Sequence, residues 1–149
     1  MSVEGQKFYP GCEALADELL ELAGEYGRAA ELLRPAGRRK APLSYVPYRL
    51  LAIHAVELYL NAYLLTKGNT AASLRGLQHN LAERTRSAEK ADLKLRKLTS
   101  LHLRKMTENR EYLVVRYDAA QVGTVSQLNR LEATLTEVAE KVETAMGRK

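Results

Sequence analysis

Residues 44–81 read SYVPYRLLAIHAVELYLNAYLLTKGNTAASLRGLQHNL and contain the chain's best apolar run, Leu50–Leu65. A helix over this run would be hydrophobic on nearly every side, and such helices belong in the centre of a bundle. Three polar residues, His54, Glu57 and Asn61, nevertheless lie within it. Polar groups inside a core are costly unless they find partners. We therefore expect this segment to hold both the central helix and the protein's candidate binding chemistry.

Helical periodicity continues on both sides of this segment, with apolar residues recurring at spacings of three and four. The predicted helices cover residues 12–33, 44–67, 78–91 and 92–117, with a short turn at 71–75 and a last helix after Gly123. The 92–117 helix is expected to kink near Asn109. Its segment YLVVRY has the composition of a strand, but no second strand is available to pair with it. The sequence thus predicts an all-α, single-domain, up-down bundle of four to five main helices over residues 1–149.

The predicted helix starts rest on side chains that can accept a hydrogen bond from the first backbone N–H groups. Ser44 is the expected cap of the central helix, and Thr70 can cap the short turn that follows it. The next helix is expected to start near His79. Thr124 or Ser126 is the expected cap of the last helix.

The composition of the chain restricts the classes of protein to which it can belong. With 149 residues the chain can build one core, and 46% hydrophobic residues are ordinary for a globular domain. No uninterrupted apolar run reaches the length of a membrane span, and the N-terminal residues lack the pattern of a secretion signal. One cysteine, Cys12, excludes an internal disulfide, and three histidines on separate segments give no zinc-binding pattern. We expect a cytoplasmic protein without a membrane segment, metal or cofactor.

Charge is distributed unevenly around a net value of +5. Residues 13–31 contain six acids and one arginine, whereas residues 75–105 contain nine bases and three acids. The basic segment could bind a polyanion such as RNA. Alternatively, the acidic first helix could pack beside the basic helices within the chain.

Three short motifs resemble the HEPN superfamily, a group of small helical-bundle domains linked to nucleotide and RNA biology. The segment Ala55–Ala62 resembles the family's buried helix, except that Asn61 stands where lysine is usual. His79-Asn80-Leu81 resembles the start of the next helix, with Asn80 in place of aspartate, and Arg116-Tyr117 resembles a late Arg-Tyr pair. The resemblance covers residues 44–118. It implies a HEPN-like domain that acts as a homodimer.

A ligand site is predicted around the buried polar residues of the central helix. Glu57, Asn61 and His79 would orient a nucleotide or RNA ligand, while Arg110 and Arg116 would contact its phosphate. The same polar cluster could instead have a purely structural role and fix the register of two helices. We accordingly expect a binding or interaction module that is not an enzyme.

Two alternatives stay open. Nuclease members of the superfamily carry an arginine followed by a histidine four to six residues later, and Arg96 and His102 match that spacing. They would serve a metal-independent, toxin-like ribonuclease, although one such match is expected by chance in a chain of this composition. The other alternative is a structural partner protein that docks on another chain through the acidic first helix or the Glu-lined last helix.

Overall fold

The computed structural model describes residues 9–148, which form seven α-helices and three short 3-10 helices and no β-strand. The α-helices are α1 (Ala16–Leu33), α2 (Val46–Thr66), α3 (Ala71–Gly76), α4 (Leu81–Lys90), α5 (Lys97–Glu108), α6 (Glu111–Tyr117) and α7 (Leu128–Ala145). The 3-10 helices are η1 (Arg34–Ala36), η2 (Pro42–Tyr45) and η3 (Ala119–Thr124). The all-α prediction is therefore confirmed, but the helices outnumber the four to five that were predicted.

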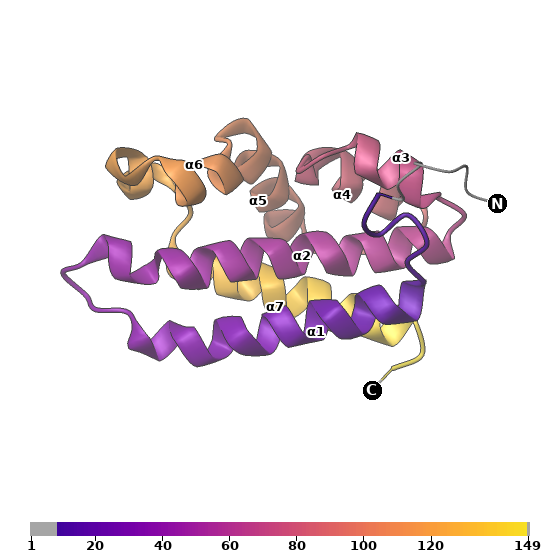
Figure 1. Ribbon diagram of the computed structural model, residues 1–149, viewed down its shortest axis with the longest axis horizontal. Coiled ribbons are helices and arrows are strands. Elements are labelled where there is room, and N and C mark those ends of the chain that lie inside the picture. Colours follow the sequence, from indigo (N-terminus) through magenta and orange to yellow (C-terminus); the bar gives the residue numbers. More distant parts are fainter. Residues whose placement is uncertain (1–8, 149) are drawn as a thin grey trace, which may run out of the picture.

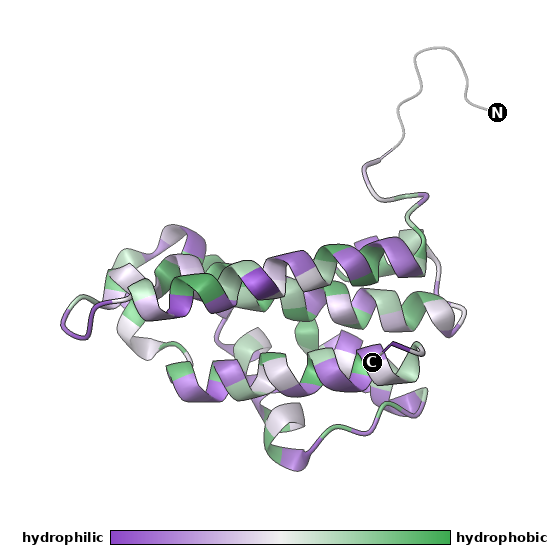
Figure 2. Ribbon diagram, turned by 90° about the horizontal axis from the view of Figure 1, so that it is seen from below, coloured by the Kyte–Doolittle hydropathy of each residue, from purple (hydrophilic) through white to green (hydrophobic). Residues whose placement is uncertain are grey.

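Helix α2 is the central element of the bundle (Figure 1). It contributes more buried residues than any other helix, as expected from its apolar circumference. Helices α1 and α7 pack along it, and α4 and α6 cover another part of its surface. Viewed from below, α1 and α7 run side by side, with hydrophobic and hydrophilic residues interspersed along each (Figure 2). None of the helices within residues 9–148 is long and apolar enough to cross a membrane.

Small residues let α1 approach α2 closely. Gly27 is buried in this contact, and a Cβ added there or at Gly24 would lie 3.8 Å from the Tyr59 hydroxyl. That hydroxyl contacts a Glu143 carboxylate oxygen of α7 at 3.4 Å, while the Tyr63 hydroxyl donates to the Ala91 carbonyl at 2.6 Å. Tyr59 and Tyr63 therefore fill the core with their rings and satisfy their hydroxyls at its edge.

Two of the predicted helix caps are wrong. Tyr45, not Ser44, is the N-cap of α2, because the chain first forms η2 and the Ser44 hydroxyl is used inside that turn by Arg38 and Ala41. At α7 the N-cap is Gln127, and Ser126 belongs to a buried network described below. Thr70 does cap α3, accepting from the Ser73 N–H at 3.0 Å.

The predicted helix 92–117 is broken in two. Arg110 adopts a left-handed conformation with φ 50° and ψ 43°, so α5 ends at Glu108 and α6 starts in a new direction at Glu111. The preceding connection also differs from expectation, because Gln78 has φ 52° and α4 begins at Leu81 with Asn80 as its cap. The Asn80 side chain accepts from the Glu83 N–H at 3.0 Å. Asparagine and aspartate are equally good at this position, so the departure from the HEPN pattern does not weaken the helix start.

Candidate ligand-binding site

A buried carboxylate forms the base of the candidate site. Glu57 projects from the middle of α2 and is 7% exposed. One of its oxygens, Oε1, lies 2.9 Å from Nδ1 of His79, and the other lies 3.9 Å from the Arg84 guanidinium. Because an ionised carboxylate only accepts hydrogen bonds, Nδ1 of His79 carries the proton in this contact. The structure thus joins Glu57 and His79, which the sequence analysis had grouped.

Arg84 was not predicted, yet it organises this cluster. It is 1% exposed and donates from Nε to the Asn61 side-chain oxygen at 2.7 Å and from Nη2 to the Leu74 carbonyl at 3.1 Å. A further bond runs to the Asn80 carbonyl at 3.2 Å. Burial lowers the pKa of the Arg84 guanidinium, and the Glu57 carboxylate opposes that shift. Arg84 therefore supplies the buried cation that a lysine at position 61 would otherwise provide.

Arg84 could have been found from its position in the helical pattern. It shares one face of α4 with Leu81, Thr85 and Ala88, all of which are buried. A charged residue on the apolar face of a helix requires a buried partner, and Glu57 was the one acid already expected in the core.

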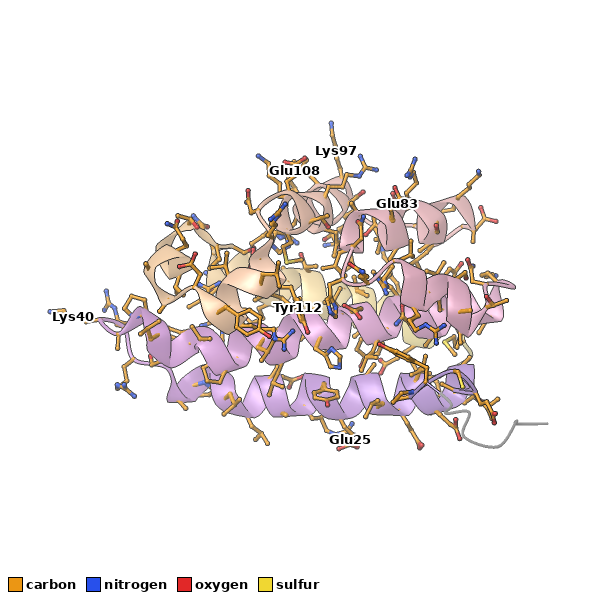
Figure 3. The ribbon with its side chains drawn as sticks, turned by 45° about the horizontal axis from the view of Figure 1, so that its top comes forward. Glu25, Lys40, Glu83, Lys97, Glu108 and Tyr112 are labelled. Atoms are coloured by element: carbon orange, nitrogen blue, oxygen red, sulfur yellow. The ribbon has the colours of Figure 1, made fainter. Side chains whose placement is uncertain are left out.

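Aromatic rings and a guanidinium build one wall of the site. The His79 ring stacks on Tyr112 with 3.8 Å between centroids and 28° between planes. The Arg116 guanidinium lies 4.9 Å from the Tyr112 ring centroid and 4.8 Å from that of Tyr117, and it donates to the Tyr112 hydroxyl at 2.7 Å. Figure 3 shows Tyr112 between α6 and α2. The planar groups of His79, Tyr112, Arg116 and Tyr117 thus follow one another along this wall.

These groups line a cleft of about 540 Å³. A second arginine, Arg75 of α3, also lines it and lies 4.4 Å from the ring centroid of Tyr9. Among the described residues, neither Arg75 nor Arg116 forms an ion pair with a carboxylate. Nε2 of His79 and Nδ2 of Asn61 likewise make no hydrogen bond within residues 9–148, whereas Nδ1 of His79 contacts Glu57 and Oδ1 of Asn61 accepts from Arg84. The cleft therefore offers a ligand the guanidinium groups of Arg75 and Arg116 and a wall of stacked rings. It also offers one hydrogen-bond acceptor, Nε2 of His79, and one donor, Nδ2 of Asn61.

Arg110 lies beside this cleft. It lines a neighbouring cleft of about 460 Å³, which shares His79 and Tyr112 with the first. Four of the five residues predicted to bind a ligand therefore line one cleft: Glu57, Asn61, His79 and Arg116. The fifth, Arg110, lies on the other side of the wall formed by His79 and Tyr112.

The predicted catalytic residues have different surroundings. His102 is 8% exposed in α5, and Arg96 is an exposed N-cap residue whose backbone N–H donates to Glu137 at 2.6 Å. Burial, with a smaller contribution from Arg130, lowers the pKa of His102 to about 4. No hydrogen bond joins Arg96 to His102 in the described part of the chain.

Both ring nitrogens of His102 are engaged in a second buried network. The Ser126 hydroxyl lies 2.5 Å from a Glu111 carboxylate oxygen, to which it donates. It can therefore accept from Nε2 of His102 at 2.6 Å, which leaves Nδ1 to accept from the Thr134 hydroxyl at 2.7 Å. This pattern fixes His102 as a neutral ring that ties α5 to α7.

The described residues contain no group of three or more His, Cys, Asp or Glu side chains arranged to hold a metal ion. Comparison with protein-family models, curated proteins and solved structures finds no match to this chain. The function is therefore argued from the geometry of the cleft.

Proposed function

We propose that this protein binds a nucleotide in the cleft between α2, α3 and α6. The observation that carries this proposal is the pair of arginines, Arg75 and Arg116, which line one cleft and lie against tyrosine rings. A nucleotide presents both features that such a cleft can recognise, a phosphate and a flat ring. The HEPN-like resemblance implies the same class of ligand.

The phosphate is assigned to the two arginines. A guanidinium offers several N–H donors in a planar fork that suits phosphate oxygens. Stacking on tyrosine holds each guanidinium in place and leaves part of its edge available for donation. Replacing either group removes charged hydrogen bonds that are each worth about 1.5–3 kcal/mol.

The ring is assigned to the wall formed by His79, Tyr112 and Tyr117. Base stacking on an aromatic side chain contributes about 1–3 kcal/mol and depends little on which base is present. Tyr117 is 72% exposed and so has a free face for this contact. Asn61 and His79 then supply the hydrogen-bonding groups that fix the ring's orientation.

Binding is tested by calorimetry and thermal unfolding with ATP, AMP and inorganic phosphate. At a nucleotide concentration of about 100 Kd the native state gains about 2.7 kcal/mol, which corresponds to a rise in Tm of about 5–10 °C for a chain of this size. Arg75→Ala and Arg116→Ala are each expected to weaken binding at least about tenfold. Tyr112→Leu removes the stack and should weaken AMP more than inorganic phosphate.

Arg86→Ala is the matched control. Arg86 is an exposed arginine of α4 that pairs with Glu83 and does not line the cleft. Its variant should bind like the wild type. Absence of any shift in Tm with millimolar nucleotide, or equal losses in Arg86→Ala and Arg116→Ala, would contradict the proposal.

The ribonuclease alternative has less support from the geometry. His102 is buried, and both of its ring nitrogens are bonded to hydroxyls of the core. A general base must reach the proton that it removes. The homodimer, the protein partner and the cytoplasmic location stay predictions from the sequence.

A further inference from the structure

The outward surface of α1 is acidic along its length. Five exposed acids share it with one base, Arg28, which pairs with Glu25. Leu22 and Leu32 stand among these charges with exposed fractions of 44% and 79%. We call this surface the acidic face; it consists of Asp17, Glu18, Glu21, Leu22, Glu25, Arg28, Glu31 and Leu32.

The outward surface of α5 has the opposite charge and likewise exposes two leucines. At 100° per residue, its exposed residues fall within an arc of about 120°. Leu98 and Leu101 are 65% and 49% exposed in that arc. We call this surface the basic face; it consists of Lys97, Leu98, Leu101, Arg104, Lys105 and the single acid Glu108, and it is preceded by exposed Lys94 and Arg96.

The two faces cannot meet within one chain. Helix α1 packs on α2 and α7, whereas α5 packs on α4, α6 and α7 and lies on the other side of α2 (Figure 1). In Figure 3 the labelled Glu25 and Lys97 point in opposite directions from the body of the molecule. The packing of the acidic first helix beside the basic middle helices, one of the arrangements considered from the sequence, is therefore not formed inside the chain.

We propose that the acidic face of one copy binds the basic face of a second copy. Charge complementarity identifies the partner, because each face carries the sign that the other lacks and each places leucines among its charges. Opposite potentials attract the two surfaces during approach, and the leucines remove apolar area from water once they touch. This proposal is independent of the nucleotide cleft.

The geometry makes the contact head-to-tail. Because the two faces point away from each other, one pair of molecules can form only one such contact. Each end of the pair then keeps a free face, so association continues beyond two chains or closes into a ring. This arrangement differs from the two-fold dimer implied by the HEPN-like resemblance.

The contact is expected to be weak and sensitive to salt. Helix α5 has 12 residues and is therefore about 18 Å long, so the shared surface falls in the range of transient interfaces. The Debye length falls from about 30 Å at 0.01 M salt to about 3 Å at 1 M. Sedimentation equilibrium of the full chain should therefore give an average mass that rises with protein concentration in low salt and returns to 16.7 kDa in high salt.

Reversing the charge of each face distinguishes this contact from other modes of association. The variant Glu21→Lys/Glu25→Lys/Glu31→Lys changes the net charge of the acidic face from −4 to +2, and Lys97→Glu/Lys105→Glu changes that of the basic face from +2 to −2. Each variant alone should sediment as a single chain in low salt, because its two faces now have the same sign. An equimolar mixture of the two should associate again, because each variant supplies the face that the other lacks.

Asp118→Lys/Gln121→Lys is the control, because it adds positive charge at exposed residues outside both faces and should leave association unchanged. Circular dichroism confirms that each variant is folded. The proposal is overturned if the wild type stays at 16.7 kDa at every ionic strength, or if its mass stops at two chains. It is also overturned if the mixture fails to associate, or if reversal of the basic face abolishes only RNA binding.

Discussion

At the scale of single residues, the cleft depends on two opposite charges buried in the core. The nearest charged atoms of Glu57 and Arg84 lie 3.9 Å apart, and both side chains are buried. Removing one partner of such a pair typically costs about 3–5 kcal/mol, because the other charge stays buried without compensation. The pair therefore stabilises the fold mainly because neither charge is left buried without an opposite charge beside it.

Arg84→Met is expected to reduce the free energy of unfolding by about 3–5 kcal/mol. Adding Glu57→Gln to this variant should restore part of the loss, because no uncompensated charge remains. Urea unfolding of the wild type, the two single variants and the double variant measures the coupling. Strictly additive losses would show that the two residues do not interact in the folded protein.

His102 makes stability depend on pH. Its pKa is about 4 in the folded chain, because burial disfavours the charged ring, whereas an unfolded histidine titrates near 6.5. The unfolded state binds more protons between these values, so stability is fully present above about pH 6.5 and falls by about 1.4 kcal/mol per unit towards pH 4. Urea unfolding at several pH values should show a loss of up to about 3 kcal/mol from this residue.

His102→Gln supplies the comparison, because glutamine keeps hydrogen-bonding groups and does not titrate. The variant should lose less stability between pH 6.5 and 4 than the wild type does. Its remaining slope includes His54, whose pKa burial also lowers. Identical slopes in both proteins would place the ring of His102 in contact with water.

At the scale of the elements, the start of α4 rests on Asn80. Its side chain accepts from the Glu83 N–H, and its carbonyl accepts from Arg84. Asn80→Ala is expected to lower the free energy of unfolding by about 1 kcal/mol through loss of the cap. Asn80→Asp keeps an accepting oxygen and should stay close to the wild type. A thermal or urea transition that does not distinguish the two variants would contradict this role of the side chain.

The two longest stretches of predicted helix in the first half of the chain were predicted closely, one from its amphipathic spacing and the other from its apolar circumference. The expected helix 12–33 corresponds to α1 and the expected helix 44–67 to α2, with differences confined to their ends. The break between α5 and α6 lies beside the kink that was predicted near Asn109, but two separate helices were not predicted, because the apolar spacing continues across the break and the left-handed residue is Arg110, not glycine. Such a conformation is imposed by packing on either side of the residue and leaves no mark in local periodicity.

Only part of the candidate site was predicted, because tertiary packing again leaves little mark in the local sequence. Glu57, Asn61 and His79 stand out because they are polar within or beside an apolar run. Arg84 can be recognised from the buried face that it shares on α4, but Arg75 sits in a segment rich in bases, where nothing local separates a cleft-lining arginine from a solvated one. Their roles depend on where α3 and α4 fold back on α2, which is a property of the tertiary structure.

At the scale of the whole molecule, the candidate cleft and the two charged faces occupy different parts of the bundle around α2. The candidate cleft lies over α2 between α3 and α6, while the charged faces of α1 and α5 lie on opposite sides of the bundle. The net charge of +5 therefore hides a molecule with an acidic side and a basic side. Such a distribution orients an approaching charged partner more strongly than the net charge suggests.

The turn at Arg110 has one more consequence. It brings two consecutive residues of α6 to different parts of the core: Glu111 accepts hydrogen bonds from Ser126, and Tyr112 stacks on His79. One peptide unit therefore belongs to both polar networks, the one around His102 and the one around Glu57. The His102 network, which links α5 to α7, and the wall of the cleft are therefore joined through adjacent residues of α6, so a change in the backbone at Glu111 or Tyr112 acts on both.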